Sequence, residues 1–324
     1  MKKHQLTFFT QTFCAAFATG FLLATPAFGQ QKPDDRILAS REQILFYTAE
    51  WKGERLPDGR PMVPDRLLER LKKLRVEDVW QLLNQLGYRN QFEGGWQIIH
   101  EDQPLAGRAL TALYMPLRPD VQQRMTAQGK DAGHIGPMNS WPIDQLQKGD
   151  IYVADAFGKI AQGTLIGDKL GNSIFARSGN GVVFDAAIRK VESLAKIDGF
   201  NAFVRGWHPS FLEETMLMGI NVPIRIGSVA VMPGDVVFGR KVGVVFIPAH
   251  LVERVVVTAE IVELRDEFVF ERVRARVYTP GQVDTRWTEA IEKDFLGWLT
   301  QGNRAARLPV PVERMQDYLR ERTW

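Results

Sequence analysis

The chain has 324 residues, of which 45% are hydrophobic and 24% are charged. This composition excludes a disordered or collagen-like chain, and the length is enough for one large domain or two small ones. Forty-one Lys and Arg residues oppose 38 Asp and Glu residues, which gives a net charge of +3. We predict no nucleic-acid partner, because the basic excess is small and dispersed.

Residues 1–29 are typical of an export signal. Lys2 and Lys3 are followed by an apolar run to Leu23 and then by small residues, so we expect cleavage and a periplasmic or secreted protein without membrane attachment. An uncleaved anchor is the alternative. Cys14 is the only cysteine and lies inside this signal. The mature chain would therefore lack thiol catalysis, cysteine zinc sites and disulfides.

The segment 30–65 is polar and rich in Pro and Gly, which predicts an N-terminal arm with one short helix at about 42–51. Leucines then recur at helical spacing between 67 and 86. This pattern predicts two amphipathic helices that cover one face of a sheet.

An α/β core is predicted to follow. The run 107–119 and the segment after Gly149 favour strands, and 228–248 has the alternation of β-hairpins. Between them we expect a helix at Thr164–Arg177 and strands at 182–186 and 202–207.

A helical C-terminal extension, 251–324, is expected after a domain at 66–250. A long helix is predicted from Ala249 to about Arg276, followed by a last helix that bears an apolar stripe. The stripe suits either an intrachain core or an interface between subunits. Its residues are Trp287, Ile291, Phe295, Trp298 and Leu299.

One segment, 167–190, has residues suited to binding an anion. Asp168 is placed at a helix start and Arg189 just after a strand, so both could face one pocket. The backbone amides of Lys169 and Leu170, together with the Arg189 fork, would make a cradle for a carboxylate. The alternative is a helix cap and a surface ion-pair partner, which such spacing also allows.

Other polar features give weaker signals. Pro233-Gly234-Asp235 is read as a tight turn in which Asp235 bonds its own backbone. His100, His134, His208 and His250 form no i, i+4 pair, so a histidine metal site has no local support. His208 ends a strand in a polar loop and stands out among them. Lys190, next to Arg189, predicts either a solvated edge or part of an anion site.

The order of several segments resembles a known family. Gly149-Asp150, GDKLG, GNGVVFDAAIRK, FVRGWHP, Asn221-Val222-Pro223, SVAVMPGDVVFG and GVVFIP together are similar to the RraA-like superfamily. It includes the regulator of ribonuclease activity A and the class II 4-hydroxy-4-methyl-2-oxoglutarate aldolases. The resemblance implies a swivelling β/β/α fold, assembled as a homotrimer or hexamer with active sites at subunit interfaces.

The aldolases have an Asp, twenty intervening residues and then Arg-Asp, and Asp168 and Arg189 match the first two. In the family the Arg binds the pyruvyl group and stabilises the enolate, and the first Asp positions a water for proton transfer. The final Asp helps to hold a divalent metal, but Lys190 stands there in this chain. We therefore expect no metal site and no cofactor. Mg2+ or Mn2+ would require other carboxylates, such as Asp185 or an acid from a neighbouring subunit.

Three roles for Lys190 remain open. It could stabilise an enolate with its own charge, form a Schiff base, or mark a pocket kept only for binding or assembly. The leading interpretation is an aldolase- or decarboxylase-like lyase, or an isomerase, acting on a small oxyacid, keto acid or ketosugar. The alternative is a non-catalytic binding or structural protein. Regulation of a ribonuclease is disfavoured for an exported chain, and no glycine-rich cofactor loop supports a methyltransferase.

Overall fold

A computed structural model of the chain describes residues 1, 35–311 and 314. The expected export signal and its cleavage site lie outside these residues. In the described part of the chain, no helix combines the length and the apolar character needed to cross a membrane.

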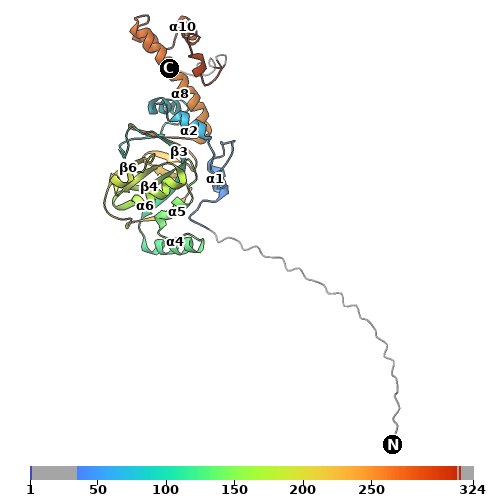
Figure 1. Ribbon diagram of the computed structural model, residues 1–324, viewed down its shortest axis with the longest axis vertical. Helices are drawn as coiled ribbons and strands as arrows, with labels where there is room; N and C mark the ends of the chain where they lie inside the picture. Colours follow the sequence, from blue (N-terminus) through green and yellow to red (C-terminus); the bar gives the residue numbers. More distant parts are fainter. Residues whose placement is uncertain (2–34, 312–313, 315–324) are drawn as a thin grey trace. The chain divides into compact units, whose positions relative to one another are not determined.

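Nine strands of the described chain form one mixed sheet (Figure 1). Its order is β1-β11-β10-β3-β4-β5-β6-β2, β7 also pairs with β3, and β8 and β9 form a separate hairpin. The strands are β1 (Phe92–Glu93), β2 (Gln97–Ile98), β3 (Leu105–Pro116), β4 (Asp150–Ile166), β5 (Val182–Ile188), β6 (Ala202–Trp207), β7 (Thr215–Ile220), β8 (Ile224–Ile226), β9 (Val229–Val231), β10 (Val236–Arg240) and β11 (Gly243–Ile247).

The parallel strands β3, β4, β5 and β6 form the centre of the sheet. β5 is buried along its whole length, because both faces of the sheet are covered there. In β5, Val182 and Phe184 pack into the core on one face, whereas Val183 packs on the other, under the β8–β9 hairpin. The mixed α/β architecture predicted from the sequence is confirmed.

Helices cover the sheet in two groups. α2, α3 and α8 pack on β10 and β11, as predicted for the first two, and α5 and α6 lie over the parallel strands (Figure 1). The helices are α1 (Arg41–Tyr47), α2 (Asp65–Leu71), α3 (Val76–Gln85), α4 (Pro119–Asp131), α5 (Trp141–Asp144), α6 (Asp168–Ser178), α7 (Val191–Leu194), α8 (Val252–Arg274), α9 (Pro280–Val283) and α10 (Glu289–Leu299), with 3-10 turns at Met138–Ser140, Ala249–Leu251 and Ala305–Arg307.

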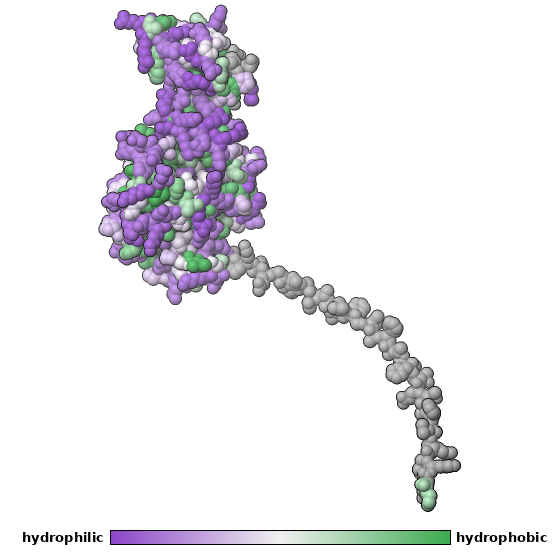
Figure 2. Space-filling model, in the orientation of Figure 1, coloured by the Kyte–Doolittle hydropathy of each residue, from purple (hydrophilic) through white to green (hydrophobic). Residues whose placement is uncertain are grey.

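The C-terminal helices have an aromatic core of their own. Phe268 of α8 lies with its ring centroid 5.5 Å from Trp287, 5.3 Å from Phe295 and 5.8 Å from Trp298. The predicted stripe of the last helix is thus an intrachain core. Figure 2 shows a largely hydrophilic surface over this part of the chain on the face displayed, as expected when the rings are turned inward.

One predicted helix boundary is wrong. The helix expected at Thr164–Arg177 begins only at Asp168, because Thr164 and Ile166 still pair with β5 as the end of β4. β-branched residues favour this extended backbone. The sequence analysis also missed α4, which buries only Gly129 among its thirteen residues and so has no apolar stripe, and it missed β7 and β8.

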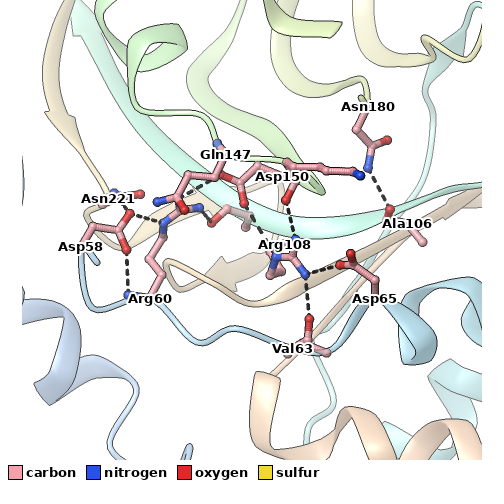
Figure 3. A network of polar contacts seen from close by, with 12 residues as sticks. Asp58, Arg60, Val63, Asp65, Ala106, Arg108, Gln147, Asp150, Asn180 and Asn221 are labelled. Carbon is pink, nitrogen blue, oxygen red and sulfur yellow. Dashed lines mark hydrogen bonds and ion pairs between the residues drawn. The ribbon is translucent and has the colours of Figure 1, made fainter. Parts of the chain in front are cut away.

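A buried arginine joins the N-terminal arm to the sheet (Figure 3). Arg60 has no exposed surface; its Nη2 donates to Asp150 Oδ2 at 2.9 Å, and its Nε donates to Asp58 Oδ2 at 2.7 Å. The same Asp150 oxygen accepts the Gln147 N–H at 2.8 Å. Arg108, on β3, extends the network by donating to the Val63 carbonyl at 2.7 Å.

Burial alone would lower the pKa of the Arg60 guanidinium, but the two carboxylates outweigh it and raise that pKa. Burial also raises the pKa of Asp150, against the lowering effect of Arg60, so the charge on both groups depends on their close contact. Removing one member of such a pair leaves an uncompensated buried charge, which is far more costly than losing an exposed pair.

We expect Arg60→Met to lower the free energy of unfolding by about 3–5 kcal/mol, because Asp150 would stay buried without its hydrogen-bonded cation and with only the more distant Arg108, at 3.9 Å, near it. Denaturant unfolding measures this difference. Lys241→Met is the matched control, since it breaks an ion pair with Glu101 at the surface and should leave the midpoint unchanged. An equal effect of the two substitutions would show that the buried pair has no special role.

The turn before β10 is formed as predicted. Asp235 Oδ2 accepts the backbone N–H of Met232 at 2.8 Å, and the side chain is almost fully buried. Burial raises the pKa of Asp235 from 3.8 to about 7, against the lowering effect of its bonds from the Met232 and Ala249 amides. Folding thus favours the protonated carboxyl.

This raised pKa predicts a stability that falls with pH. The contribution of Asp235 is fully present below its unfolded pKa near 4 and is lost as pH rises through about 7. Relative to Asp235→Asn, the wild type should lose up to about 1 kcal/mol of unfolding free energy per pH unit in that window. Urea titrations between pH 4 and 8 test this, and a constant difference between the two proteins would refute it.

Candidate functional site

The ends of two parallel strands bring the predicted site residues together. Ile166, the last residue of β4, pairs with Ile188, the last residue of β5, and the Arg189 N–H donates to the Ile166 carbonyl at 3.1 Å. Asp168, two residues after Ile166, and Arg189, directly after Ile188, therefore leave the same edge of the sheet. This placement at the carboxyl edge of parallel strands is where α/β folds form their ligand sites.

Arg189 is held between a glycine and an aromatic ring. A Cβ atom on Gly167 would lie 3.3 Å from both Cγ and Nε of Arg189, so a residue with a side chain would crowd the guanidinium. On the other side, Arg189 Cζ lies 4.4 Å from the centroid of the Phe211 ring. This stacking orients the planar fork.

Asp168 and Lys190 form an ion pair across the site. Lys190 Nζ lies 3.1 Å from the Asp168 carboxylate, and the two side chains are 46% and 30% exposed. The hydrogen bond from Lys190 is the main cause that lowers the pKa of Asp168. Asp168 Oδ1 also accepts the Lys169 N–H at 2.9 Å. A substrate carboxylate would thus compete with Asp168 for one amide of the predicted cradle.

The backbone of Lys190 is left-handed, with φ 58° and ψ 46°, and Lys190 caps the short helix α7. Residues with a side chain rarely adopt this conformation, and strain of this kind is concentrated at functional sites. The turn directs the chain away from β5 immediately after Arg189. It places the two adjacent cations at different positions around one cavity.

The cavity has a volume of about 290 Å³ and is lined by all five predicted residues. The sequence analysis missed part of the wall, which comes from the loops before β4 and after β6. Asn139 Nδ2 is bonded to the Leu165 carbonyl at 2.8 Å, and Phe211 stacks on Arg189. The polar loop at His208 was a partial signal for this wall, because it leads to Phe211. The full lining is Asn139, Thr164, Leu165, Ile166, Gly167, Asp168, Lys169, Leu170, Arg189, Lys190, Phe211 and Leu212.

The residues of this chain do not fit a divalent cation here. Asp168 is paired with Lys190, and Asp185 is bonded to Arg205 Nε at 2.6 Å and does not line the cavity. Across the described residues, no group of three His, Cys, Asp or Glu side chains is arranged to hold a metal ion. His208 Nδ1 instead lies 2.9 Å from Ser210 Oγ.

The balance of charge favours an anionic ligand. Lys169, Arg189 and Lys190 surround the cavity against the single carboxylate of Asp168. Two oxygens of a small oxyacid could accept hydrogen bonds from the Arg189 guanidinium. The ammonium of Lys169 or Lys190 could then lie near further negative charge on the same ligand. The apolar faces of Leu170, Phe211 and Leu212 would enclose its carbon skeleton.

A family model described as "RraA-like: Aldolase/RraA" matches residues 72–246. A protein of Halalkalibacterium halodurans, provisionally named a 4-hydroxy-4-methyl-2-oxoglutarate aldolase, is 34% identical over 123 residues, which are 38% of this chain and 58% of the relative. A relative from Azotobacter vinelandii with the same provisional name is 28% identical over 110 residues, 34% of this chain and 66% of its own length. The chain thus spans under two thirds of each curated relative.

Solved structures share the fold. RraAS2 of Streptomyces coelicolor, described as an unusual member of the RNase ES inhibitor RraA family, has a TM-score of 0.56 and 25% identity. The match covers 65% of this chain and 100% of RraAS2. An uncharacterised protein of Pseudomonas syringae has a TM-score of 0.58 and 21% identity, and the match covers 72% of this chain and 99% of that protein.

Proposed function

Because the chain belongs to the RraA-like (Aldolase/RraA) family, we propose that it is a lyase that cleaves a small 2-keto acid through an enolate, without a divalent metal. The observation that carries the proposal is the position of Arg189, whose fork is stacked on Phe211 beside Lys190 in a cavity rich in cations. The provisional aldolase names of the relatives support the substrate class.

In the proposed reaction, the Arg189 guanidinium binds the carboxylate and keto oxygens of the substrate. When the carbon–carbon bond of the aldol breaks, its electron pair enters the fragment that keeps the keto acid and forms the enolate. The hydroxyl of the other fragment loses its proton and becomes a carbonyl. Asp168, kept ionised by Lys190, accepts this proton through a water, and a proton returned to the enolate completes the cleavage.

In this proposal, Lys190 supplies a positive charge that faces the negative charge developing on the enolate oxygen. The Lys190 ammonium already lies 3.1 Å from the Asp168 carboxylate. Substrate binding would therefore shift an existing hydrogen bond and would not require a new charge in an apolar site. A fixed cation at the place where negative charge forms lowers the barrier without a metal ion. We favour this role over a Schiff base, because the Lys190 amine is bonded to the Asp168 carboxylate and is not free to attack a carbonyl carbon.

A second candidate function is binding without catalysis. The pair between Lys190 and Asp168 favours it, because a carboxylate engaged by both Lys190 and the Lys169 amide is a weaker base. In that case, keto acids would bind at Arg189 and remain unchanged.

The cellular context of the proposal comes from the sequence. We propose that residues 1–29 direct export to the periplasm or the medium and that the protein acts as a homotrimer or hexamer. Sequencing the N-terminus of periplasmic protein tests the first part, and light scattering tests the second.

We expect the purified protein to cleave at least one member of a panel of 4-hydroxy-2-keto acids, with activity that survives EDTA. Arg189→Ala should lower kcat/KM by about a hundredfold or more, and Arg189→Lys should restore little, because an ammonium cannot bind two oxygens in parallel. Calorimetry separates catalysis from binding. Binding without turnover would leave the second candidate, and activity abolished by EDTA and restored by Mn2+ would overturn the metal-free proposal.

The charge at position 190 predicts a gain of metal affinity on substitution. Lys190→Asp replaces an ammonium with a carboxylate beside Asp168, so Mg2+ or Mn2+ should bind at least tenfold more tightly than to the wild type. Lys190→Gln is the control, since it removes the cation without adding an acid and should have a smaller effect. Tight binding of Mn2+ by the wild-type site would show that other carboxylates complete it.

A further inference from the structure

A second and larger cavity lies between the N-terminal arm and the RraA-like domain. Its volume is about 420 Å³, within the range of small-molecule sites. One wall is the end of α1 and the loop after it, and the opposite wall comes from the segments after α3, before β10 and before α8. The lining residues are Phe46, Tyr47, Thr48, Ala49, Glu50, Trp51, Tyr88, Gln91, Ala230, Met232, Asp235, Pro248, Ala249 and His250.

The arm wall is held in place by Arg55. Its guanidinium donates to Thr48 Oγ1 at 2.7 Å, to the Trp51 carbonyl at 3.0 Å and to the Gly59 carbonyl at 2.9 Å. The Trp51 indole N–H donates to the Glu54 carbonyl at 2.7 Å. The wall is therefore organised before any ligand binds, which reduces the entropy lost on binding.

Aromatic rings are concentrated on this cavity. At the end of α1, the side chain of Phe46 is 78% exposed and that of Tyr47 is 41% exposed. Trp51 and Tyr88 line the cavity with them. Tyr88 Oη lies 3.3 Å from His250 Nε2, which fixes both rings at the domain wall.

The charges on this cavity are opposite to those of the Arg189 site. The Glu50 carboxylate lines it, together with Asp235, whose pKa burial raises to about 7, and no Lys or Arg is among the lining residues within the part of the chain that the structure describes. Burial lowers the pKa of His250, so this ring is neutral at pH 7. Lys52 and Arg55 belong to the same loop and donate to the carbonyls of Ala49 and Thr48, but neither residue is itself among those that line the cavity.

We propose that the cavity between the arm and the domain binds a small organic ammonium ion, with its cationic head over the rings of the arm and close to Glu50. Aromatic faces attract such ions through their negative quadrupole, and alkylated ammonium groups lose less hydration than an inorganic cation does. The Glu50 carboxylate adds negative charge, and no lysine or arginine among the described lining residues competes with the ligand for it. The volume suits a ligand of the size of choline and not a folded polypeptide.

Choline and its neutral isostere 3,3-dimethylbutan-1-ol test this proposal, because they differ in charge but hardly in shape. Calorimetry on the purified protein should show choline binding about tenfold or more tightly than the isostere. Glu50→Gln and Phe46→Ala should each weaken choline binding about fivefold or more. Both positions are exposed, so these substitutions should leave the fold intact, which circular dichroism checks.

Matched controls separate this cavity from other surfaces. Glu42→Gln changes an exposed acid at the other end of α1, and Phe270→Ala removes an exposed ring on α8, so neither should alter choline affinity. Arg189→Ala should also leave it unchanged, because that residue lines the other cavity. Equal affinity for choline and the isostere, no choline binding at ten millimolar, or unchanged affinity in Glu50→Gln would each overturn the proposal.

Discussion

The arrangement of the protein depends on one buried ion pair, between Arg60 of the N-terminal arm and Asp150 at the start of β4. Neither side chain is exposed, and each also bonds its surroundings, so the arm can dock only in the register that satisfies both charges. Figure 3 shows this network between the arm and the sheet. Since β4 begins at this pair and ends beside the candidate site, the same strand connects the docked arm to Asp168.

The candidate site results from strand register rather than from a local motif. A parallel pairing that ends at Ile166 and Ile188 places the next residues of both strands at one sheet edge. Twenty residues, made up of the rest of α6, a turn and strand β5, separate Asp168 from Arg189 in the sequence. The two residues meet because β5 runs parallel to β4 and ends at the same edge of the sheet. The left-handed turn at Lys190 then brings a second cation back toward Asp168.

Two cavities of opposite charge occupy different parts of one chain. The cavity at Arg189 has three cations and one acid, whereas the cavity at Glu50 has acids and rings and a neutral histidine. The residues that line the cavity at Arg189 all lie within 72–246, the segment matched by the family model. The cavity at Glu50 also needs residues 46–51 of the arm, which precede that segment. An arm fixed by Arg60 could thus add a binding surface to the family fold without disturbing its central sheet.

The sequence by itself determined the α/β class, most of the strands and helices, the family, and five of the residues that line the first cavity. It could do so because hydrophobic periodicity, turn residues and ordered motifs act over short distances along the chain. It did not determine where the helix at Asp168 starts, that α4 forms although it has no apolar stripe, or which residues contact Lys190. Only the tertiary structure decided that Lys190 pairs with Asp168, that Phe211 stacks on Arg189, and that residues 46–51 line one cavity together with His250. These contacts join segments far apart in the sequence, and no local propensity encodes which distant side chain a strand end or an arm will meet.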